Sequence, residues 1–427
     1  MHDLLPAALG RWQKIETTTA HLLARYGYRE LRFPVLEKTA LFTRTIGTAT
    51  DIVAKEMYSF ADRNGDNLSL RPEGTAGCVR ACLQHRLLDR PQRLWYRGPM
   101  FRHERPQKGR LRQFHQLGVE IFGLPGPDID AELLALCARL WQELGLQDAL
   151  QLEINSLGNQ AARQAHRAAL LDYLNAHRDQ LDADSQRRLT TNPLRILDSK
   201  NPQMQDLIAA APALPDFLDP DSAAHFDQLR THLDALGIAH RLNPRLVRGL
   251  DYYNRTVFEW TTDRLGTQGT LCGGGRYDDL VAQLGGPPTA ALGFGLGLER
   301  LILLLDQVHG PTAPRPQADL YLVSDQPTAP LILAEKLRTA LPHLAIQNHC
   351  GGGSFKTQFK KADRSGAQIA LILGPDERAA DRIGIKHLRA LHPQETLPLT
   401  ELLERLRSLP PLSIMPAAAQ PTKGIEP

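Results

Sequence analysis

Basic residues crowd a short loop near residue 100 of this 427-residue chain. The loop contains Arg102, Arg105, Lys108, Arg110 and Arg112. Such a group of cations can bind phosphates through charge-assisted hydrogen bonds. A solvated hairpin with a charged tip is the simpler alternative. We favour a binding site, because the segments on either side of the loop carry polar groups that would converge on one ligand.

Those two segments have the patterns of β-strands. Residues 94–101 are rich in large apolar and aromatic side chains. Residues 114–122 alternate, which places Phe114, Gln116, Gly118 and Glu120 on one face and His115, Leu117, Val119 and Ile121 on the other. The first face combines a ring, an amide, a glycine and a carboxylate. This mixture is suited to the floor of a pocket for a small polar ligand.

Two further stretches carry polar groups that could complete such a pocket. In R-P-E-G-T at residues 71–75, Glu73 and Thr75 could cap a helix, or the carboxylate could bind an ammonium group. Residues 246–262 are rich in β-branched and aromatic residues, which predicts a strand carrying Arg248, Tyr252 and Tyr253. On pattern alone, such a tyrosine pair belongs to a core or a sheet surface as often as to a site.

Glycines mark two more stretches. Residues 271–278, L-C-G-G-G-R-Y-D, have three in a row before Tyr277, which would let the backbone approach a ligand closely. In residues 291–300, A-L-G-F-G-L-G-L-E-R, alternating glycines would leave one strand face bare for a flat ligand, with Glu299 and Arg300 at its end. This G-x-G-x-G spacing differs from the G-x-G-x-x-G of dinucleotide-binding folds.

Other elements must position these groups. Residues 6–25 predict a helix, and residues 30–37 a strand that Pro34 restricts to an edge or an interface. A helix at 128–144 and a strand at 150–154 follow the basic hairpin. Strands at 319–325, 344–349 and 367–374 alternate with helices at 330–341 and 355–364, which indicates a small α/β domain with parallel strands.

Composition sets broad limits. The chain is 42% hydrophobic and 23% charged, as in soluble globular proteins, and a net charge of +3 does not indicate a nucleic-acid-binding coat over the whole surface. We expect no signal peptide and no membrane span. The five cysteines form no C-x-x-C pair, so free core thiols in a reducing cytosol are expected.

The basic hairpin, residues 93–122, resembles motif 2 of the class II aminoacyl-tRNA synthetases. Residues 6–37 resemble motif 1, and residues 291–305 resemble motif 3. The stretches R-G-L-D-Y-Y at 248–253 and G-G-G-R-Y-D at 273–278 are similar to the histidine signatures of the histidyl-tRNA synthetases. The resemblance implies an α+β catalytic domain built on an antiparallel sheet, with a helical insertion and a C-terminal α/β anticodon-binding domain.

The resemblance also implies domain boundaries. The catalytic domain would comprise residues 1–158 and 241–310, interrupted by the helical insertion at 159–240. A linker at 311–317 would lead to the anticodon-binding domain at 318–409, and residues 410–427 would form a disordered tail.

Each polar residue of the pocket acquires an implied role. Histidine would be bound by Glu73, Thr75 and Gln116 at its amino group, by Glu120 and Tyr253 at its ring, and by Tyr252 and Tyr277, which would close the pocket. ATP would be bound by Arg102, Glu104, Phe114, Arg248, Glu299 and Arg300. Among these, Arg102, Arg248 and Arg300 would be catalytic, since they would neutralise the phosphates.

The implied reaction is the ATP-dependent ligation of L-histidine to its tRNA through histidyl-adenylate, with release of pyrophosphate and AMP. Mg²⁺ would accompany ATP, with Glu299 as a candidate ligand, and we expect no metal site made by side chains alone. The expected partners are histidine tRNA, L-histidine, ATP and a second copy of the chain in a homodimer. The expected location is the cytoplasm.

Two rival functions share parts of this pattern. A regulatory subunit of ATP phosphoribosyltransferase has the catalytic-domain fold and binds histidine, but Arg248, Arg300 and the C-terminal α/β domain argue against it. A synthetase for threonine, proline or glycine would have a similar C-terminal domain, but the two histidine signatures argue against it. Neither the H-I-G-H nor the K-M-S-K-S motif of class I synthetases is present.

Overall fold

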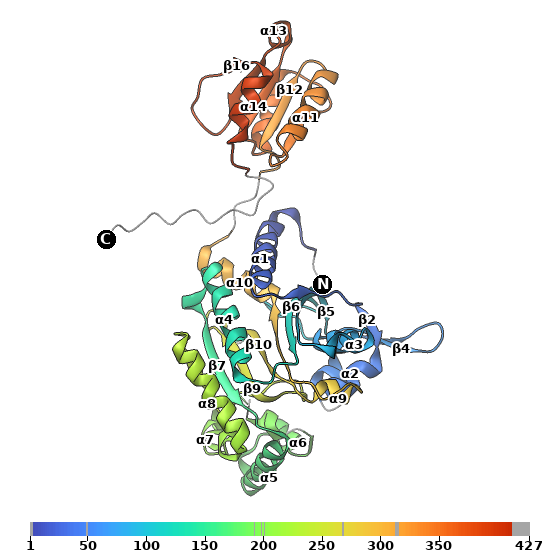
Figure 1. Cartoon of the computed structure of the whole chain (residues 1–427), viewed down its shortest axis with the longest axis vertical. Coiled ribbons are helices and arrows are strands. Elements are labelled where there is room, and N and C mark those ends of the chain that lie inside the picture. Colours follow the sequence, from blue (N-terminus) through green and yellow to red (C-terminus); the bar gives the residue numbers. More distant parts are fainter. Residues whose placement is uncertain are drawn as a thin grey trace, which may run out of the picture. The chain divides into compact units, whose positions relative to one another are not determined.

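The chain divides into two compact units in a computed structural model (Figure 1). The model describes residues 3–47, 50–191, 193–197, 199, 201–266, 269–311 and 316–411. One unit is formed mainly by Thr18–Pro311, and the other by Leu4–Thr17 with the described residues from 316 onwards. Most of the predicted linker and tail, residues 312–315 and 412–427, lie outside the described residues.

The larger unit is built on an eight-stranded sheet in the order β1-β5-β6-β11-β10-β9-β7-β8. These strands are β1 Arg29–Glu30, β5 Gln92–Phe101, β6 Gln113–Phe122, β11 Ala291–Gly297, β10 Thr270–Arg276, β9 Asn254–Thr261, β7 Gln151–Ser156 and β8 His240–Leu242. Only the outermost pairings of this sheet, β1 with β5 and β7 with β8, are parallel. The predicted hairpin is confirmed, since β5 and β6 pair antiparallel along their whole length.

The helices of the larger unit are α2 Thr39–Ile46, α3 Thr75–Gln84, α4 Pro127–Glu143, α5 Gln160–Ala176, α6 Ala183–Thr191, α7 Gln205–Ala209, α8 Pro220–Ala235, α9 Leu280–Gln283 and α10 Leu298–His309. Helix α1, Pro6–Arg25, is divided between the two units after Thr17. Helices α8 and α4 pack together beside β7 and β9. Helices α5 to α7 enclose an apolar cluster of their own that includes Leu170, Leu174 and Ile208. The predicted insertion is helical, and its boundaries stay a prediction.

The prediction of one continuous strand at residues 30–37 is wrong for residues 31–35. Only Arg29–Glu30 joins the large sheet, at its edge as expected, and β2 Leu36–Lys38 joins a separate sheet with β3 Ser59–Ala61 and β4 Asn67–Leu70. Between β1 and β2, the Arg71 guanidinium donates hydrogen bonds to the carbonyls of Phe33 (3.0 Å) and Pro34 (3.4 Å). A side chain therefore takes acceptors that a neighbouring strand would otherwise use.

The strand predicted at residues 246–262 forms only from Asn254, as β9. In the segment before β9, side chains again bind backbone carbonyls that a strand would have used. Asn155 donates to the carbonyl of Leu246 (3.0 Å), and Arg163 donates to the carbonyl of Tyr253. The residues Arg248 to Tyr253 consequently form a loop before β9 and are not part of the strand.

The C-terminal unit has a five-stranded sheet in the order β13-β12-β14-β15-β16. Its strands are β12 Leu320–Ser324, β13 Ile346–Asn348, β14 Ile369–Leu373, β15 Ile383–His387 and β16 Glu395–Leu397, and its helices are α11 Thr328–Ala340, α12 Phe355–Arg364, α13 Pro375–Ala379 and α14 Leu399–Arg407. The three predicted strands are parallel as expected. Strands β15 and β16 were not predicted, and they add antiparallel pairings.

Two expectations from composition can be compared with the described residues. None of their helices combines the length and apolar character that crossing a bilayer requires. Four of the five cysteines are buried and all are unpaired, but Cys350 is exposed, so the expectation of core thiols is wrong for that residue.

A buried ion pair ties the sheet to the helices. Arg276, at the end of β10, is fully buried and donates to Asp130 on α4 (2.6 and 2.9 Å). Asp130 also contacts His225 of α8 (3.3 Å). Burial alone would raise the pKa of Asp130, but hydrogen bonds from His225 and Arg276 outweigh it and hold that pKa below its usual value. The network fixes the end of β10, directly before Tyr277.

Replacing Asp130 by alanine should destabilise the larger unit by about 3–5 kcal/mol, because it leaves the Arg276 charge buried without a partner. Denaturant unfolding followed by tryptophan fluorescence would measure the loss. The control is Glu143→Ala, which removes the partly exposed Arg25–Glu143 pair and should cost less than about 1 kcal/mol. Equal losses in the two variants would contradict the proposed importance of the buried pair.

Candidate active site

A row of glycines crosses the middle of the large sheet. From one strand to the next, the paired residues are Tyr96, Gly118, Gly295, Gly273, Glu259, Glu153 and Arg241. Directly paired residues share one face of a sheet. The three consecutive glycines therefore form a shallow trough in the sheet surface, between Tyr96 on one side and Glu259 on the other.

The alternating glycines predicted a bare strand face, and this prediction is wrong, because neighbouring side chains lie over the glycines. A Cβ atom at Gly295 would be 2.1 Å from Nε2 of Gln116, and one at Gly293 would be 1.9 Å from Oε2 of Glu120. A Cβ atom at Gly118 would overlap the Tyr96 ring at 2.1 Å. The glycines thus make room for the protein's own polar groups, and only Gly297 at the end of β11 has open space above it.

A cavity of about 170 Å³ opens beside Gly273, Gly295 and Gly297. Its lining includes every residue predicted to bind ATP: Arg102, Glu104, Phe114, Arg248, Glu299 and Arg300. Gln116, predicted to bind the amino group of histidine, also lines it. The structure therefore brings together side chains from β6, α10 and two loops that are distant in the sequence.

Arg102, which lines the cavity, is held in place by a backbone carbonyl and an aromatic ring. Its Nε donates to the carbonyl of Pro72 (2.8 Å), and its guanidinium lies over the Phe114 ring, 5.3 Å from the centroid. Glu104 lies between two cations, 3.8 Å from Arg102 and 3.4 Å from Arg110. These contacts keep the cations apart and directed at the same space.

Glu299 and Arg300, which also line the cavity, lie in the first turn of α10. Arg300 donates to the carbonyls of Thr270 (2.8 Å) and Gly109 (3.2 Å). Burial, with Arg110 and Arg102 nearby, lowers the pKa of Arg300, so the cavity favours an anion that would relieve this repulsion. The two carboxylate oxygens of Glu299 accept the backbone N–H of His115, each at 2.9 Å.

Arg248 reaches the same cavity from the loop before β9. Its guanidinium pairs with Glu259 and lies 5.7 Å from the centroid of the Tyr253 ring. Burial opposes the charge on Arg248, but the adjacent Glu259 carboxylate outweighs this effect and raises the pKa. The Nε atom of Arg248 is buried and has no hydrogen-bond partner among the described residues, so an acceptor from a ligand would satisfy it.

The second group of predicted residues surrounds Glu120, which is 1% exposed. Its carboxylate accepts hydrogen bonds from the hydroxyls of Thr75 (2.8 Å), Tyr96 (2.9 Å) and Tyr277. Burial raises the pKa of Glu120 to about 8, although these three donors act in the opposite direction. The carboxylate is thus held ready for a polar ligand within an apolar core.

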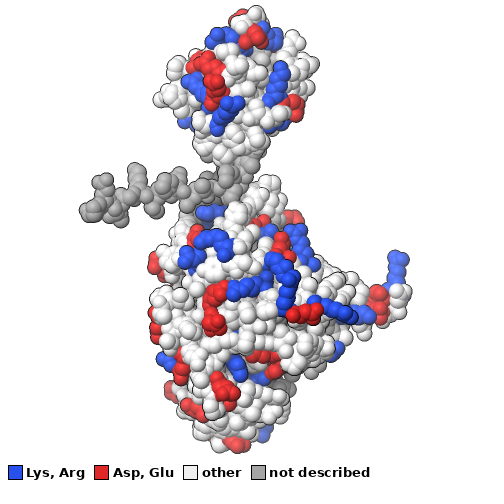
Figure 2. Space-filling model, in the orientation of Figure 1, with Lys and Arg blue, Asp and Glu red and all other residues white. Residues whose placement is uncertain are grey.

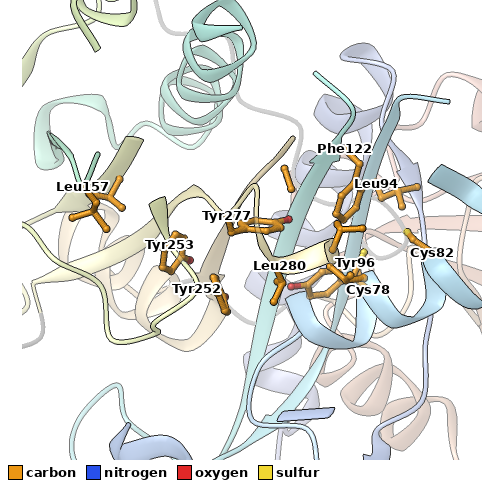
Figure 3. Packing of buried hydrophobic residues seen from close by; sticks show 14 of the residues in the cluster. Cys78, Cys82, Leu94, Tyr96, Phe122, Leu157, Tyr252, Tyr253, Tyr277 and Leu280 are labelled. Carbon is orange, nitrogen blue, oxygen red and sulfur yellow. The ribbon is translucent and has the colours of Figure 1, made fainter. Parts of the chain in front are cut away.

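Glu73 and the remaining tyrosines complete this group. Glu73 caps α3 by accepting the backbone N–H groups of Thr75 (2.6 Å) and Ala76 (2.9 Å), and burial raises its pKa. The Tyr252 ring packs 4.6 Å from that of Tyr253 and 5.6 Å from that of Tyr277, between centroids (Figure 3). The helix-cap alternative for Glu73 is therefore confirmed, and whether it also binds an ammonium group stays a prediction.

Sequence reasoning missed two residues of this site, Tyr96 and Glu259. Both had a signal. Tyr96 is paired with Gly118, the one position on the polar face of β6 that lacks a side chain. Glu259 is an acidic residue within the apolar segment V-F-E-W of β9, and a buried charge there needs a partner.

The donor set of the cavity fits a metal ion that arrives with phosphates. Glu104 and Glu299 are the carboxylates of its lining among the described residues. No cluster of three or more His, Cys, Asp or Glu side chains suited to a metal occurs in the described part of the chain. Mg²⁺ is commonly bound by one or two carboxylates together with substrate phosphates, which this lining could supply.

The variant Glu120→Gln should flatten the dependence of stability on pH. With a pKa of about 8, folded Glu120 keeps its proton where the unfolded residue, near 4.5, has lost it. Stability should therefore fall as pH rises through this window. Between pH 5 and pH 7 the native chain should lose on the order of 2 kcal/mol through this group, and the variant should not. Denaturation midpoints with the same pH slope in both proteins would contradict this.

Comparison with known proteins agrees with this geometry. Residues 1–301 match a family model described as histidyl-tRNA synthetase, and residues 331–409 match one described as an anticodon-binding domain. A curated histidine--tRNA ligase from Halorhodospira halophila is 57% identical over 408 residues, which cover 95% of this chain and 96% of that protein.

Solved structures show the same architecture. The crystal structure of S. aureus histidyl-tRNA synthetase is similar with a TM-score of 0.79 at 34% identity, covering 95% of this chain and 98% of that one. Histidyl-tRNA synthetase from Nostoc sp. PCC 7120 shares the fold, with a TM-score of 0.68 at 19% identity over 95% of this chain and 97% of that one. The chain belongs to the histidyl-tRNA synthetase family.

Proposed function

We propose that this protein ligates L-histidine to its cognate tRNA in an ATP-dependent reaction through a histidyl-adenylate intermediate. The observation that carries the proposal is the presence of Arg102, Arg248 and Arg300 around one cavity, on a sheet that also buries Glu120. The 57% identity to a curated histidine--tRNA ligase supports it. Catalysis of this kind depends mainly on positioning and on neutralising charge.

The two groups of residues divide the substrates between them. Gln116 and Glu120 lie on the same face of β6, and their side chains lie over Gly295 and Gly293, two residues apart on β11. Histidine would bind between them, with its ring at Glu120 and Tyr253, and with Tyr252 and Tyr277 closing the pocket. Its amino group would bind Glu73, Thr75 and Gln116. The Oε1 atom of Gln116 is buried without a partner among the described residues, and an ammonium group would satisfy it.

ATP would occupy the cavity. Arg102 would bind the α-phosphate and Arg300 the γ-phosphate, while adenine would stack on Phe114 with its amino group at Glu104. Mg²⁺ bound with ATP would neutralise the β- and γ-phosphates. Arg248 would lie between the histidine carboxylate and the α-phosphate, and would stabilise the charge that develops as the carboxylate oxygen attacks phosphorus and pyrophosphate leaves. The tRNA 3′-hydroxyl would then attack the acyl carbon and release AMP.

ATP–pyrophosphate exchange with each standard amino acid in turn tests this function. Exchange with histidine alone is expected, and Arg248→Ala should lower its rate by about 10²–10³-fold without unfolding the protein. Exchange with another amino acid would assign a different synthetase. A folded protein that binds histidine but supports no exchange would instead favour the regulatory-subunit alternative.

We also propose that the protein is a cytoplasmic homodimer that contacts tRNA partly through its C-terminal unit. Basic side chains lie in local patches among acidic ones on the visible face (Figure 2). The unpaired cysteines are typical of a reducing compartment. The two edge strands of the three-stranded sheet each expose an apolar side chain, Phe60 (48% exposed) on β3 and Leu36 (39%) on β2, and exposed apolar side chains on one sheet favour contact with another protein surface.

Phe60→Asp should therefore weaken the dimer. Light scattering of the native chain should give twice the mass of one chain, and the variant should shift towards one chain on dilution. Leu236→Asp is the matched control, because Leu236 is exposed to a similar extent, at 55%, but lies after α8. A native chain that remains monomeric at high concentration would contradict the homodimer.

A further inference from the structure

We propose that Glu259 is a positioning residue for adenylate formation, which orients Arg248 directly and Arg300 through Thr270. The inference rests on the function proposed above. It assigns a task to an acidic residue that does not line the cavity itself, but that contacts two residues that do.

The place of Glu259 in the sheet determines what it can reach. It is paired with Gly273 on β10, which has no side chain. Space beside Glu259 is therefore open to the loop before β9, which carries Arg248. The Arg248 guanidinium fills this space: a Cβ atom at Gly273 would lie 2.4 Å from its NH1 nitrogen. Glu259 binds this nitrogen and leaves the buried Nε without a protein acceptor among the described residues. One edge of the guanidinium is thereby anchored, and the rest remains available to a ligand.

Thr270 links the same carboxylate to the second arginine. Its hydroxyl donates to the other oxygen of Glu259 (2.8 Å), and its backbone carbonyl accepts from Arg300 (2.8 Å). Thr270 and both arginines line the cavity. A single carboxylate therefore fixes, directly or through one residue, the groups proposed to bind the reacting carboxylate and the γ-phosphate.

A carboxylate next to a phosphate-binding arginine has two opposing effects. It lowers the positive potential of the cavity, which weakens the binding of an anion in the ground state. It also restricts a long, flexible side chain to one orientation, which favours the transition state. Loss of Glu259 should consequently reduce kcat, whereas the KM for ATP should change little or fall. If Glu259 served only to neutralise a buried arginine, its loss would reduce the amount of folded protein rather than kcat per active site.

Glu153 provides a matched control. It is paired with Glu259 on the neighbouring strand β7 and also binds an arginine, Arg241. Neither Glu153 nor Arg241 lines the cavity. The two carboxylates thus differ mainly in whether their arginine takes part in the proposed chemistry.

The test is pyrophosphate exchange with histidine, normalised to active sites by titration. Glu259→Gln should lower kcat on the order of 10–100-fold, as when groups that orient a metal ligand are removed, and should change the KM for ATP less than about threefold. Glu153→Gln should leave kcat unchanged. Thr270→Val, which keeps the size of the side chain, should give a smaller loss of the same kind, and provides the measurement if Glu259→Gln does not fold.

A double-mutant cycle separates positioning from an independent role. Because Arg248→Ala removes the arginine that Glu259 contacts directly, Glu259→Gln should lower kcat less in this background than in the native chain, by only the part that Thr270 transmits to Arg300. Additive losses, or a Glu259→Gln enzyme with normal kcat per active site, would overturn the inference. Absence of exchange in the native enzyme would instead refute the proposed function, so the two failures are distinguishable.

Discussion

The burial of the Glu120 carboxyl group is the constraint on which the larger unit depends. A polar group removed from water is costly unless it is hydrogen-bonded. Here its partners come from three separate elements: Thr75 begins α3, Tyr96 lies on β5 and Tyr277 follows β10. A shift of any one of these elements would remove one of the three hydrogen bonds to Glu120. Residues that would recognise a substrate are thus the same residues that hold the core together.

The glycine row extends this constraint across the sheet. Side chains that cover Gly118, Gly295 and Gly273 come from β5, β6 and the loop before β9. Each glycine is required because a neighbouring polar group occupies the volume that its Cβ would take. The Arg276–Asp130 pair, buried behind the end of β10, sets the position of the strand that carries the last of these glycines. Fold and site are therefore specified by one set of packing requirements.

Local patterns predicted the elements that follow simple rules. The alternation along β6 predicted its two faces, the hairpin with β5 was predicted correctly, and the basic loop and the glycine spacing of β11 identified several of the residues that line the cavity. The predictions were wrong at residues 31–35 and 246–253, where Arg71, Asn155 and Arg163 bind backbone carbonyls that a strand would have used. Tyr96 and Glu259 were missed because their importance follows from residues paired with them across the sheet, and pairing is not visible in one strand.

The glycine row also affects how firmly the sheet is held together. Cross-strand pairs of side chains normally stabilise neighbouring strands, and β6, β11 and β10 have none at this level. At this level the three strands are held together by backbone hydrogen bonds and by the side chains that cover the glycines. The centre of the sheet should therefore open more readily than its ends, with faster exchange of its amide protons. A bound aminoacyl-adenylate would contact Gln116 and Arg248, which cover Gly295 and Gly273, so that the reaction intermediate would act for a time as part of the protein's own core.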